Sequence, residues 1–415
     1  MTRASGPATL GAMRAGLLMR FDPSDPAVFA DPYPEYARLR EAGPLARGFG
    51  GQWVLSRHTD VSWALRDKRL TKLLPPEYYA SLVGSGESSA FLGRMQELFH
   101  DRRVTRTLGR SLNPKLEPGI ARYARGTAER LLAPALDTGR FDAVTDVGVP
   151  LPVDVVCEVF GVPAADREGF RVRVAGMVAA YNDAVVSADA GVVAARRAGA
   201  DEAVRWLRGY LRDLVSRRRA APRDDALSAL LAVPDGGGLT DDIIVDSAIM
   251  SFYAGFETAA AMLTTGLSVL ARRPDQWARL RADPALVDTA VEEFVRYDAP
   301  IQIGVRRALE PIEIDGQRIR PGRLLVLLLG SANHDERVFR SPQELDVGRT
   351  PNPHLSYGGG GYYCLGAALA RLEGAVVLDT MVRRFRTLAP AGPVVRTPRF
   401  NFRACASVPL AVTAA

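Results

Sequence analysis

Cysteine is scarce in this sequence, and segments that would mark linkers or membrane spans are missing. The 415 residues include three cysteines, Cys157, Cys364 and Cys405, which are too few and too scattered for a disulfide framework. That usage fits a reducing cytosol and predicts a cytoplasmic protein. No Pro/Gly/Ser stretch is long enough to divide the chain, and no internal repeat is visible.

The N-terminal 20 residues have a short apolar patch but no run near the ~20 residues that a membrane span needs. They also lack the apolar core of a signal peptide, so we expect a mobile tail over residues 1–20 and no membrane association. Basic residues are not interleaved with aromatic ones, which argues against nucleic-acid binding. The net charge is a modest +6, but arginines cluster in particular segments.

The chain is long and apolar enough to bury a large core. Hydrophobic residues make up 47% of it and charged residues 24%, and its length alone suggests two or three domains. Local patterns predict a helix over residues 33–41, a strand or hairpin over 49–55 and a short helix over 60–67. Much of the remaining pattern is also helical.

Residues 356–371, SYGGGGYYCLGAALAR, combine four consecutive glycines with a cysteine and a helix-forming run. Glycine reaches backbone conformations closed to other residues and lets the main chain approach a flat ligand closely. Cys364 ends this loop beside a helix N-terminus, where backbone N–H groups can stabilise a thiolate. A thiolate held in this way is a ligand for haem iron. The alternative is a buried structural cysteine in a glycine-rich loop.

The same stretch resembles the haem-binding loop of the cytochrome P-450 family, whose pattern is aromatic-Gly-x-Gly-x-His-x-Cys-x-Gly. Leu369-Ala370-Arg371 continues the family's following helix. One departure is Tyr362, where the family usually has a histidine that binds a haem propionate. The residues that match the pattern are Tyr357, Gly358, Gly360, Cys364 and Gly366.

This resemblance implies a mainly α protein with a small β portion, folded as one domain over residues 21–415. In that fold a long central helix lies over haem b (iron protoporphyrin IX), and the cysteine loop supplies the thiolate, here from Cys364. The hydroxyl of Tyr362 would still be able to donate a hydrogen bond to a propionate.

Residues 240–273 predict one long helix. Thr240 is a good N-cap with two acids behind it, and Pro274 stops the pattern. Glu257 stands in an apolar stretch, where a carboxylate is costly to bury unless it is paired or reaches water. Gly255 weakens the helix in the same turn, which could open a groove. The alternative is an exposed face of a mostly buried helix.

The segment Ala254-Gly255-Phe256-Glu257-Thr258 resembles the family's oxygen-activation signature, Ala-Gly-x-Asp/Glu-Thr. The resemblance implies that Ala254 and Gly255 lie beside the cofactor and that Thr258 donates a hydrogen bond to iron-bound dioxygen. Glu257 would relay protons.

Two basic segments hold candidates for the haem propionates. Residues 95–112 predict a basic helix, for which a solvated charged face is the default interpretation. The family usually has His-x-x-x-Arg here, whereas Val104 stands four residues after His100 in this chain. Arg306 falls where the family places a propionate-binding arginine, although Arg307 could serve instead. In the first segment the choice stays open among His100, Arg102, Arg103 and Arg106.

His354 precedes the glycine loop and is either a polar neighbour of the haem edge or ordinary hydrogen-bonded structure. Residues 286–298 predict a helix in which Glu293 and Arg296, at i and i+3, would by spacing form a weak surface pair. They also match the family's structural Glu-x-x-Arg pair, and Arg349 is the natural third member. The pattern then changes to strands, with a hairpin signal at Asp315-Gly316 and a buried strand over 324–329.

Residues 73–93 contain two prolines and three glycines and predict an irregular surface loop. In the resembled family this region covers the substrate pocket. The candidate pocket residues are Leu73, Leu74, Tyr78, Tyr79, Leu82, Ile301 and Ile303.

These features together predict a monomeric, bacterial-type haem-thiolate monooxygenase that inserts one oxygen atom from O₂ into a bulky organic substrate of secondary metabolism. The substrate could be bound to a carrier protein. Electrons would come from NAD(P)H through a separate ferredoxin and ferredoxin reductase, because no flavin or iron–sulfur segment is fused to the chain. The ferredoxin would dock on a basic face made of Arg102, Arg103, Arg106, Arg110, Arg371, Arg383 and Arg384.

Two other functions compete with this hypothesis. The same oxidant could form a C–C, C–O or C–N bond by oxidative coupling without inserting oxygen. From another class, the chain could be a non-catalytic relative that recruits a partner, an idea that loss of the cysteine would support and that the presence of Cys364 weakens.

Overall fold

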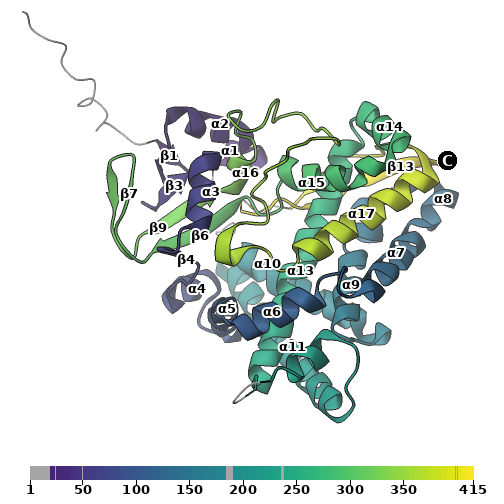
Figure 1. Ribbon diagram of the computed structural model, residues 1–415, viewed down its shortest axis with the longest axis horizontal. Helices are drawn as coiled ribbons and strands as arrows, with labels where there is room; N and C mark the ends of the chain where they lie inside the picture. Colours follow the sequence, from purple (N-terminus) through teal and green to yellow (C-terminus); the bar gives the residue numbers. More distant parts are fainter. Residues whose placement is uncertain are drawn as a thin grey trace, which may run out of the picture.

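The computed structural model describes residues 19–415 apart from positions 24, 49, 184–189, 235–237, 398 and 400, and leaves out the side chains of residues 82, 83 and 178–190. Residues 1–18 of the predicted tail lie outside that part, and its last residue, Arg20, belongs to strand β1. Helices dominate, and the strands gather mainly on one side (Figure 1). The prediction of a mainly α protein with a small β portion is confirmed.

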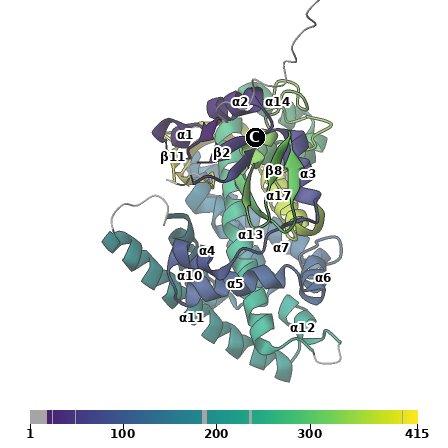
Figure 2. The same cartoon turned by 90° about the vertical axis from the view of Figure 1, so that its left-hand side faces the viewer.

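Helix α13, Asp241–Leu270, is the central element. The Thr240 side chain accepts a hydrogen bond from the Ile243 N–H at 3.3 Å, and two aspartates in the first turn favour the positive end of the helix dipole. Its 30 residues span about 45 Å, and Figures 1 and 2 show it crossing the whole helical body. Helices α9, α11, α15 and α17 pack around it.

The other helices vary from one turn to 31 residues. In chain order the α-helices are α1 Pro26–Ala30, α2 Tyr33–Ala42, α3 His58–Arg66, α4 Pro76–Val83, α5 Glu87–Leu98, α6 Arg102–Ser111, α7 Pro118–Leu132, α8 Pro134–Thr138, α9 Pro150–Val159, α10 Arg167–Asp183, α11 Ala190–Ala220, α12 Ala226–Leu231, α14 Pro274–Ala282, α15 Val287–Tyr297, α16 Leu329–Ala332 and α17 Ala367–Arg384. A π-helix, η1 Ala143–Gly148, and three 3₁₀ turns, η2 Ala164–Asp166, η3 Pro284–Leu286 and η4 Gly360–Tyr362, complete the set among the described residues.

The strands form one six-stranded sheet and three smaller ones. The large sheet has the order β1-β2-β3-β9-β6-β4, in which β1 pairs parallel with β2 and β3 parallel with β9. Its members are β1 Arg20–Phe21, β2 Ala46–Gly48, β3 Trp53–Leu55, β4 Leu70–Thr71, β6 Ile303–Ala308 and β9 Leu324–Leu328. The smaller sheets pair β10 Phe385–Pro390 with β13 Pro409–Ala414 and β5 Arg140–Asp142, β11 Val395–Arg396 with β12 Cys405–Ser407, and β7 Ile312–Ile314 with β8 Gln317–Ile319.

Two predictions about local structure are wrong. Residues 73–93 are not an irregular loop, because they contain α4 and the first half of α5. Pro75, Gly84 and Gly86 occupy the cap positions of these helices, where they delimit a helix instead of preventing one. The single helix expected over 95–112 is broken into α5 and α6, because Asp101 caps α6 by accepting the Arg103 N–H at 2.9 Å.

Most buried apolar side chains form one cluster that runs from Tyr79 to Val412 around α13, and a second cluster lies around Trp53 and Leu325 of the large sheet. The single domain over 21–415 stays a prediction, which the span of the first cluster supports. Within the described residues, length and hydropathy qualify no individual helix as a membrane span, although α13 and α14 pass as a pair bent by 106°.

Candidate active site

The loop that carries Cys364 is shaped by its glycines. Gly360 has a φ of +64°, and a Cβ there would lie 2.9 Å from the carbonyl oxygen of Leu65, so only glycine fits against α3. The Cys364 N–H donates to the Tyr357 carbonyl at 2.9 Å and closes the loop. The Ser356 hydroxyl fastens the loop's start to α15 by donating to the Val295 carbonyl at 2.5 Å.

Cys364 is the one exposed cysteine of the three, while Cys157 and Cys405 are buried. Cys364 is accessible from outside the protein, yet the surrounding atoms desolvate its thiol and raise the pKa of that thiol. Backbone N–H groups at the start of α17 and the cations of Lys72 and Arg371 act in the opposite direction and favour a thiolate. A further ligand can therefore approach the sulfur of Cys364 but not the other two.

Two cations, the buried Arg306 and the half-buried Lys72, lie beside the cysteine loop at Tyr362. Arg306 of β6 is 1% exposed, and desolvation lowers its pKa to about 10. Desolvation, followed by the charge of Arg306, lowers the pKa of Lys72 to about 8, whereas Cys364 acts to raise it. Within the described part of the chain neither cation has a carboxylate partner, and the Nε of Arg306 has no hydrogen-bond acceptor. Unpaired buried cations are unstable unless an anion joins them.

Tyr362 joins the loop to these cations. Its hydroxyl lies 3.1 Å from the Nε2 of His100 and 3.1 Å from the Oγ1 of Thr71. Its ring lies under the Arg306 guanidinium, 5.1 Å from the guanidinium carbon, and 5.7 Å from the Lys72 ammonium. The expected histidine position thus holds a tyrosine that contacts His100.

The other basic candidates are placed differently. Arg102 and Arg106 are exposed on α6, and Arg103 pairs with Asp101 at 2.8 Å. Arg307 donates from its Nε to the Leu73 carbonyl at 3.0 Å, so Arg306 is the buried member of the pair. Of the candidates in residues 95–112, His100 is the one that reaches the Tyr362 hydroxyl.

His354 has both ring nitrogens engaged by the protein. Nε2 lies 3.1 Å from Glu292, and Nδ1 accepts the Ser356 N–H at 3.3 Å. This is the hydrogen-bonded structural alternative, and it leaves no ring nitrogen for a ligand. Arg371 donates to the same carboxylate at 2.6 and 2.9 Å. Burial acts to raise the pKa of Glu292, but the bonds from His354 and Arg371 outweigh it and lower the pKa to about 2.

The middle of α13 is accessible although most of the helix is buried. Ala254 is exposed and Thr258 half-buried, whereas the neighbouring Phe252, Phe256 and Ala259 are buried. The Thr258 hydroxyl donates to the Ala254 carbonyl at 2.8 Å, a bond that loosens the helix's own hydrogen bonding. A Cβ at Gly255 would lie 3.3 Å from Val156, so this glycine lets α9 approach α13 closely.

Glu257 is ion-paired with Arg399, a residue that the sequence analysis missed. Their side chains are 19% and 10% exposed, respectively. The segment with Arg399 is held beside β6, because the Gln302 N–H donates to the Asn401 carbonyl at 3.0 Å and Ile301 forms a β-bridge with Phe402. No local signal distinguishes Arg399 from the chain's other arginines, since the pair joins residues 142 positions apart.

The candidate pocket residues do not all lie together. Leu74 and Tyr78 are half-buried against the main core, and Tyr79 is buried in it. Ile303 packs instead on the cluster around Phe21 and Tyr36. Leu73 is half-buried, Ile301 is exposed beside Phe402, and the side chain of Leu82 lies outside the described residues.

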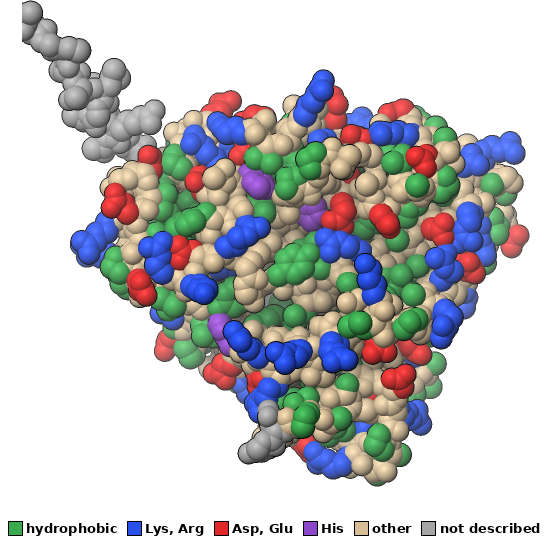
Figure 3. Space-filling view, in the orientation of Figure 1, with side chains coloured by type: hydrophobic (Ala, Val, Ile, Leu, Met, Phe, Trp, Pro, Cys, Tyr) green, Lys and Arg blue, Asp and Glu red, His purple; other side chains and the backbone are tan. Residues whose placement is uncertain are grey.

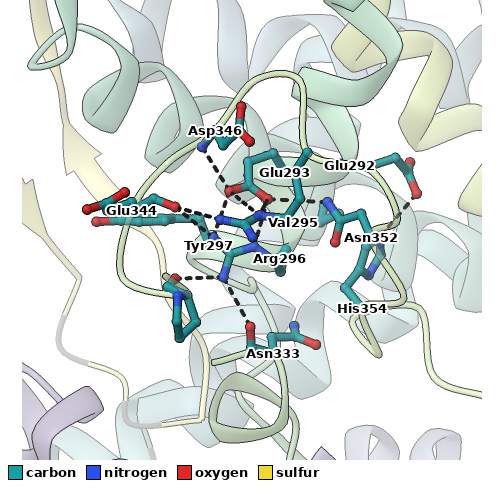
Figure 4. Close-up of polar contacts among 12 residues, drawn as sticks. Glu292, Glu293, Val295, Arg296, Tyr297, Asn333, Glu344, Asp346, Asn352 and His354 are labelled. Carbon is teal, nitrogen blue, oxygen red and sulfur yellow. Dashed lines mark hydrogen bonds and ion pairs between the residues drawn. The ribbon is translucent and has the colours of Figure 1, made fainter. Parts of the chain in front are cut away.

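Glu293 and Arg296 lie in a buried network (Figure 4), which Arg349 joins through an ion pair with Glu293. Both Arg296 nitrogens that face Glu293 lie 2.7 Å from its carboxylate, and the Nε of Arg349 lies 3.0 Å from it. Arg296 also donates to the carbonyls of Asn333 and Pro342 at 3.1 and 2.7 Å. Spacing alone supported only a weak surface pair, whereas Glu293 and Arg296 are fully buried. The pair ties α15 to the segment before the cysteine loop.

Comparisons with known proteins agree with this geometry. The family model for cytochrome P-450 matches residues 197–405. A vitamin D(3) 25-hydroxylase of Pseudonocardia autotrophica is 35% identical over 368 residues, which cover 85% of this chain and 85% of that protein. Among solved structures, CalO2 is 30% identical with a TM-score of 0.87 and covers 95% of this chain and 99% of its own. P-450 BioI, bound to an acyl carrier protein ligated to hexadec-9Z-enoic acid, is 29% identical with a TM-score of 0.83, over 93% of this chain and 100% of its own.

Proposed function

Since this chain belongs to the cytochrome P-450 family of oxygen-incorporating oxidoreductases, we propose that it inserts one oxygen atom from O₂ into a bulky organic substrate by hydroxylation or epoxidation. The observation that carries this proposal is an accessible Cys364 in a loop that lies beside two cations without carboxylate partners, Lys72 and Arg306. We further propose that the substrate belongs to secondary metabolism.

The residues present fit haem b. The sulfur of Cys364 would bind the iron, and the glycines of the loop allow the flat ring to approach the backbone. The propionates would supply the anions that Arg306 and Lys72 lack, with Tyr362 and His100 as hydrogen-bonding neighbours. When bound, the haem supplies the activation of O₂ and the oxidising power of the reaction.

Thr258 and Glu257, at the accessible turn of α13, would control the movement of protons to the reaction. The Thr258 hydroxyl donates its hydrogen bond to the Ala254 carbonyl, so its oxygen lone pairs can accept a hydrogen bond from another donor. Glu257 is ion-paired with Arg399 at the same accessible turn of α13. We assign Thr258 to local proton delivery and Glu257 to exchange between this turn and water.

Electrons would arrive from NAD(P)H through a ferredoxin and its reductase. The docking surface we propose is the basic face of α6, made of Arg102, Arg106 and Arg110, over which Lys and Arg side chains line up in Figure 3. This helix adjoins the cysteine loop, since a Cβ at Gly109 would lie 4.0 Å from Leu365. Arg371 and Arg383 contribute less, because they are paired with Glu292 and Asp379.

One structural neighbour suggests that the substrate could be attached to a carrier protein. P-450 BioI was solved with its fatty acid attached to an acyl carrier protein, and a carrier-bound substrate is therefore a second form to test for this chain.

The test of the proposed function is turnover under ¹⁸O₂ with reconstituted redox partners, across free compounds and carrier-bound acyl chains. One ¹⁸O atom in the product is the expected result. A product that gains a new C–C, C–O or C–N bond without ¹⁸O would replace oxygen insertion by oxidative coupling.

A further inference from the structure

Four arginines converge on an open hollow at the β2–β3 side of the large sheet. The hollow measures about 270 Å³ and is lined by Arg47, Gly51, Trp53, Arg318, Arg320 and Arg323. Strand β4, which carries Thr71 of the candidate active site, lies at the far end of the sheet from β1 and β2. The hollow is therefore separate from the site around Cys364.

A short sequence, RIRPGR at 318–323, supplies three of the arginines. Ile319 is buried, so Arg318 and Arg320, on either side of it in an extended strand, point to the opposite, exposed face. The Pro-Gly turn then reverses the chain, with Gly322 at a φ of +81° and the Arg323 N–H donating to the Arg320 carbonyl at 3.3 Å. This turn brings Arg323 back toward the other two.

Arg47 completes the group from the neighbouring hairpin. It faces Trp53 in the β2–β3 register, and its guanidinium carbon lies 3.3 Å from the centroid of the Trp53 ring. Its Nη1 donates to the Gly51 carbonyl at 3.1 Å. Desolvation, and then the charge of Arg323, lower the pKa of Arg47. Arg47 is thus held in place although a like charge faces it.

These four guanidinium groups form no ion pair with any carboxylate of the described chain. Glu313 stands opposite Arg318 in the β7–β8 register, but the two side chains do not form an ion pair. By contrast, the exposed Arg69, which precedes β4, is paired with Asp67 at 2.6 Å. Several like charges around one concavity concentrate the positive potential there and attract an anion.

We propose that this hollow, the arginine cradle of Arg47, Arg318, Arg320 and Arg323, binds a small ligand through a phosphoryl or diphosphoryl group. Guanidinium groups match phosphate oxygens in a planar, two-pronged geometry. Four such groups favour a ligand with two or more negative charges over a monocarboxylate.

The volume of the arginine cradle indicates which chemical group it can hold. At ~30 Å³ of liquid volume per water, 270 Å³ corresponds to roughly nine water molecules. That volume lies just below the ~300 Å³ at which pockets for drug-sized ligands begin, so the hollow has room for a diphosphoryl group. The Trp53 face is covered by Arg47, which leaves no free aromatic surface there for a stacked base.

The test is isothermal titration of the haem-loaded protein with sodium pyrophosphate and, separately, sodium phosphate, with sodium chloride keeping ionic strength constant. We expect saturable binding of one pyrophosphate that weakens at least tenfold in the double variant Arg318→Gln/Arg320→Gln. Both side chains are exposed, so the fold should be kept, and an unchanged Soret band checks this. Arg122→Gln, at an exposed arginine of α7 outside the cradle, is the matched control and should bind as the parent does.

Absence of saturable binding, or equal binding by the parent and the double variant, would overturn the proposal. A second arm compares pyrophosphate with ADP. Tighter binding of ADP supports an organic diphosphate ester as the natural ligand, and equal or weaker binding supports free inorganic diphosphate.

Discussion

Glu257, in the middle of the central helix, is ion-paired with Arg399, which belongs to the C-terminal segment beside Ile301. The pair connects the proposed proton-relay residue to a segment that borders the candidate pocket. A shift of that segment would change the environment of the Glu257 carboxylate, and we propose that this contact couples the position of the segment to the supply of protons.

Arg399→Gln should therefore change how turnover depends on pH. Removing a cation beside a carboxylate raises the carboxylate's pKa, so the acid limb of the rate profile should move to higher pH. Arg399→Lys keeps the charge and should leave that limb nearly where it is. The measurement is the rate of product formation between pH 5 and 9, and identical profiles for the parent and the Gln variant would remove the proposed coupling.

Glu257→Gln should slow turnover on the order of 10²-fold, because the amide keeps hydrogen-bonding shape but cannot carry a proton. Binding of substrate, followed by the shift of the haem spectrum, serves as the control and should stay within a few-fold of the parent. A variant that turns over at the parental rate would show that protons take another route.

Thr258→Ala should separate electron use from product formation. The variant loses the hydroxyl that now donates to Ala254, while the haem spectrum and substrate affinity should stay nearly unchanged. NAD(P)H consumption should continue. Without the Thr258 hydroxyl, protons should no longer be delivered in the way that product formation needs, so electrons should be diverted to peroxide or excess water. The ratio of product to NAD(P)H, with peroxide assayed in parallel, checks this. Full coupling in the variant would favour a hydroxyl supplied by the substrate.

Cys364→Ser should abolish the strongly red-shifted Soret band expected for the reduced, carbon-monoxide-bound protein. Cys157→Ser and Cys405→Ser are the matched controls, since both cysteines are buried away from any ligand. They should keep the band, although each places a hydroxyl in an apolar site and can lower stability. Loss of the band in either control, with its retention in Cys364→Ser, would reverse the assignment.

Tyr362→Phe should weaken haem retention modestly, because it removes the hydroxyl shared with His100 and Thr71 but keeps the ring under Arg306. Tyr362→His should be tolerated. The rate of haem transfer to apomyoglobin measures retention, with Tyr363→Phe, at an exposed neighbour, as the control. A phenylalanine variant that holds haem as well as the parent would leave Tyr362 without a role at the propionates.

The sequence was sufficient to predict helix starts and tight turns, because these depend on residues that are adjacent in the chain. Thr240 begins the central helix as its capping chemistry requires, and Asp315-Gly316 joins β7 to β8. Over residues 73–93 the prolines and glycines predict a loop, but Pro75, Gly84 and Gly86 cap two helices. Capping positions and loop positions favour the same residues, so composition alone does not separate them.

Tertiary packing decided which residues of the candidate active site contact one another. Tyr362 meets His100 across 262 positions of sequence, and Glu257 meets Arg399 across 142. An arginine on the surface and one buried beside a carboxylate look alike in the sequence, because what distinguishes them is the desolvation and the neighbours that folding provides. The sequence by itself thus determined which residues could carry the chemistry, and the packing of distant segments decided which of them stand together.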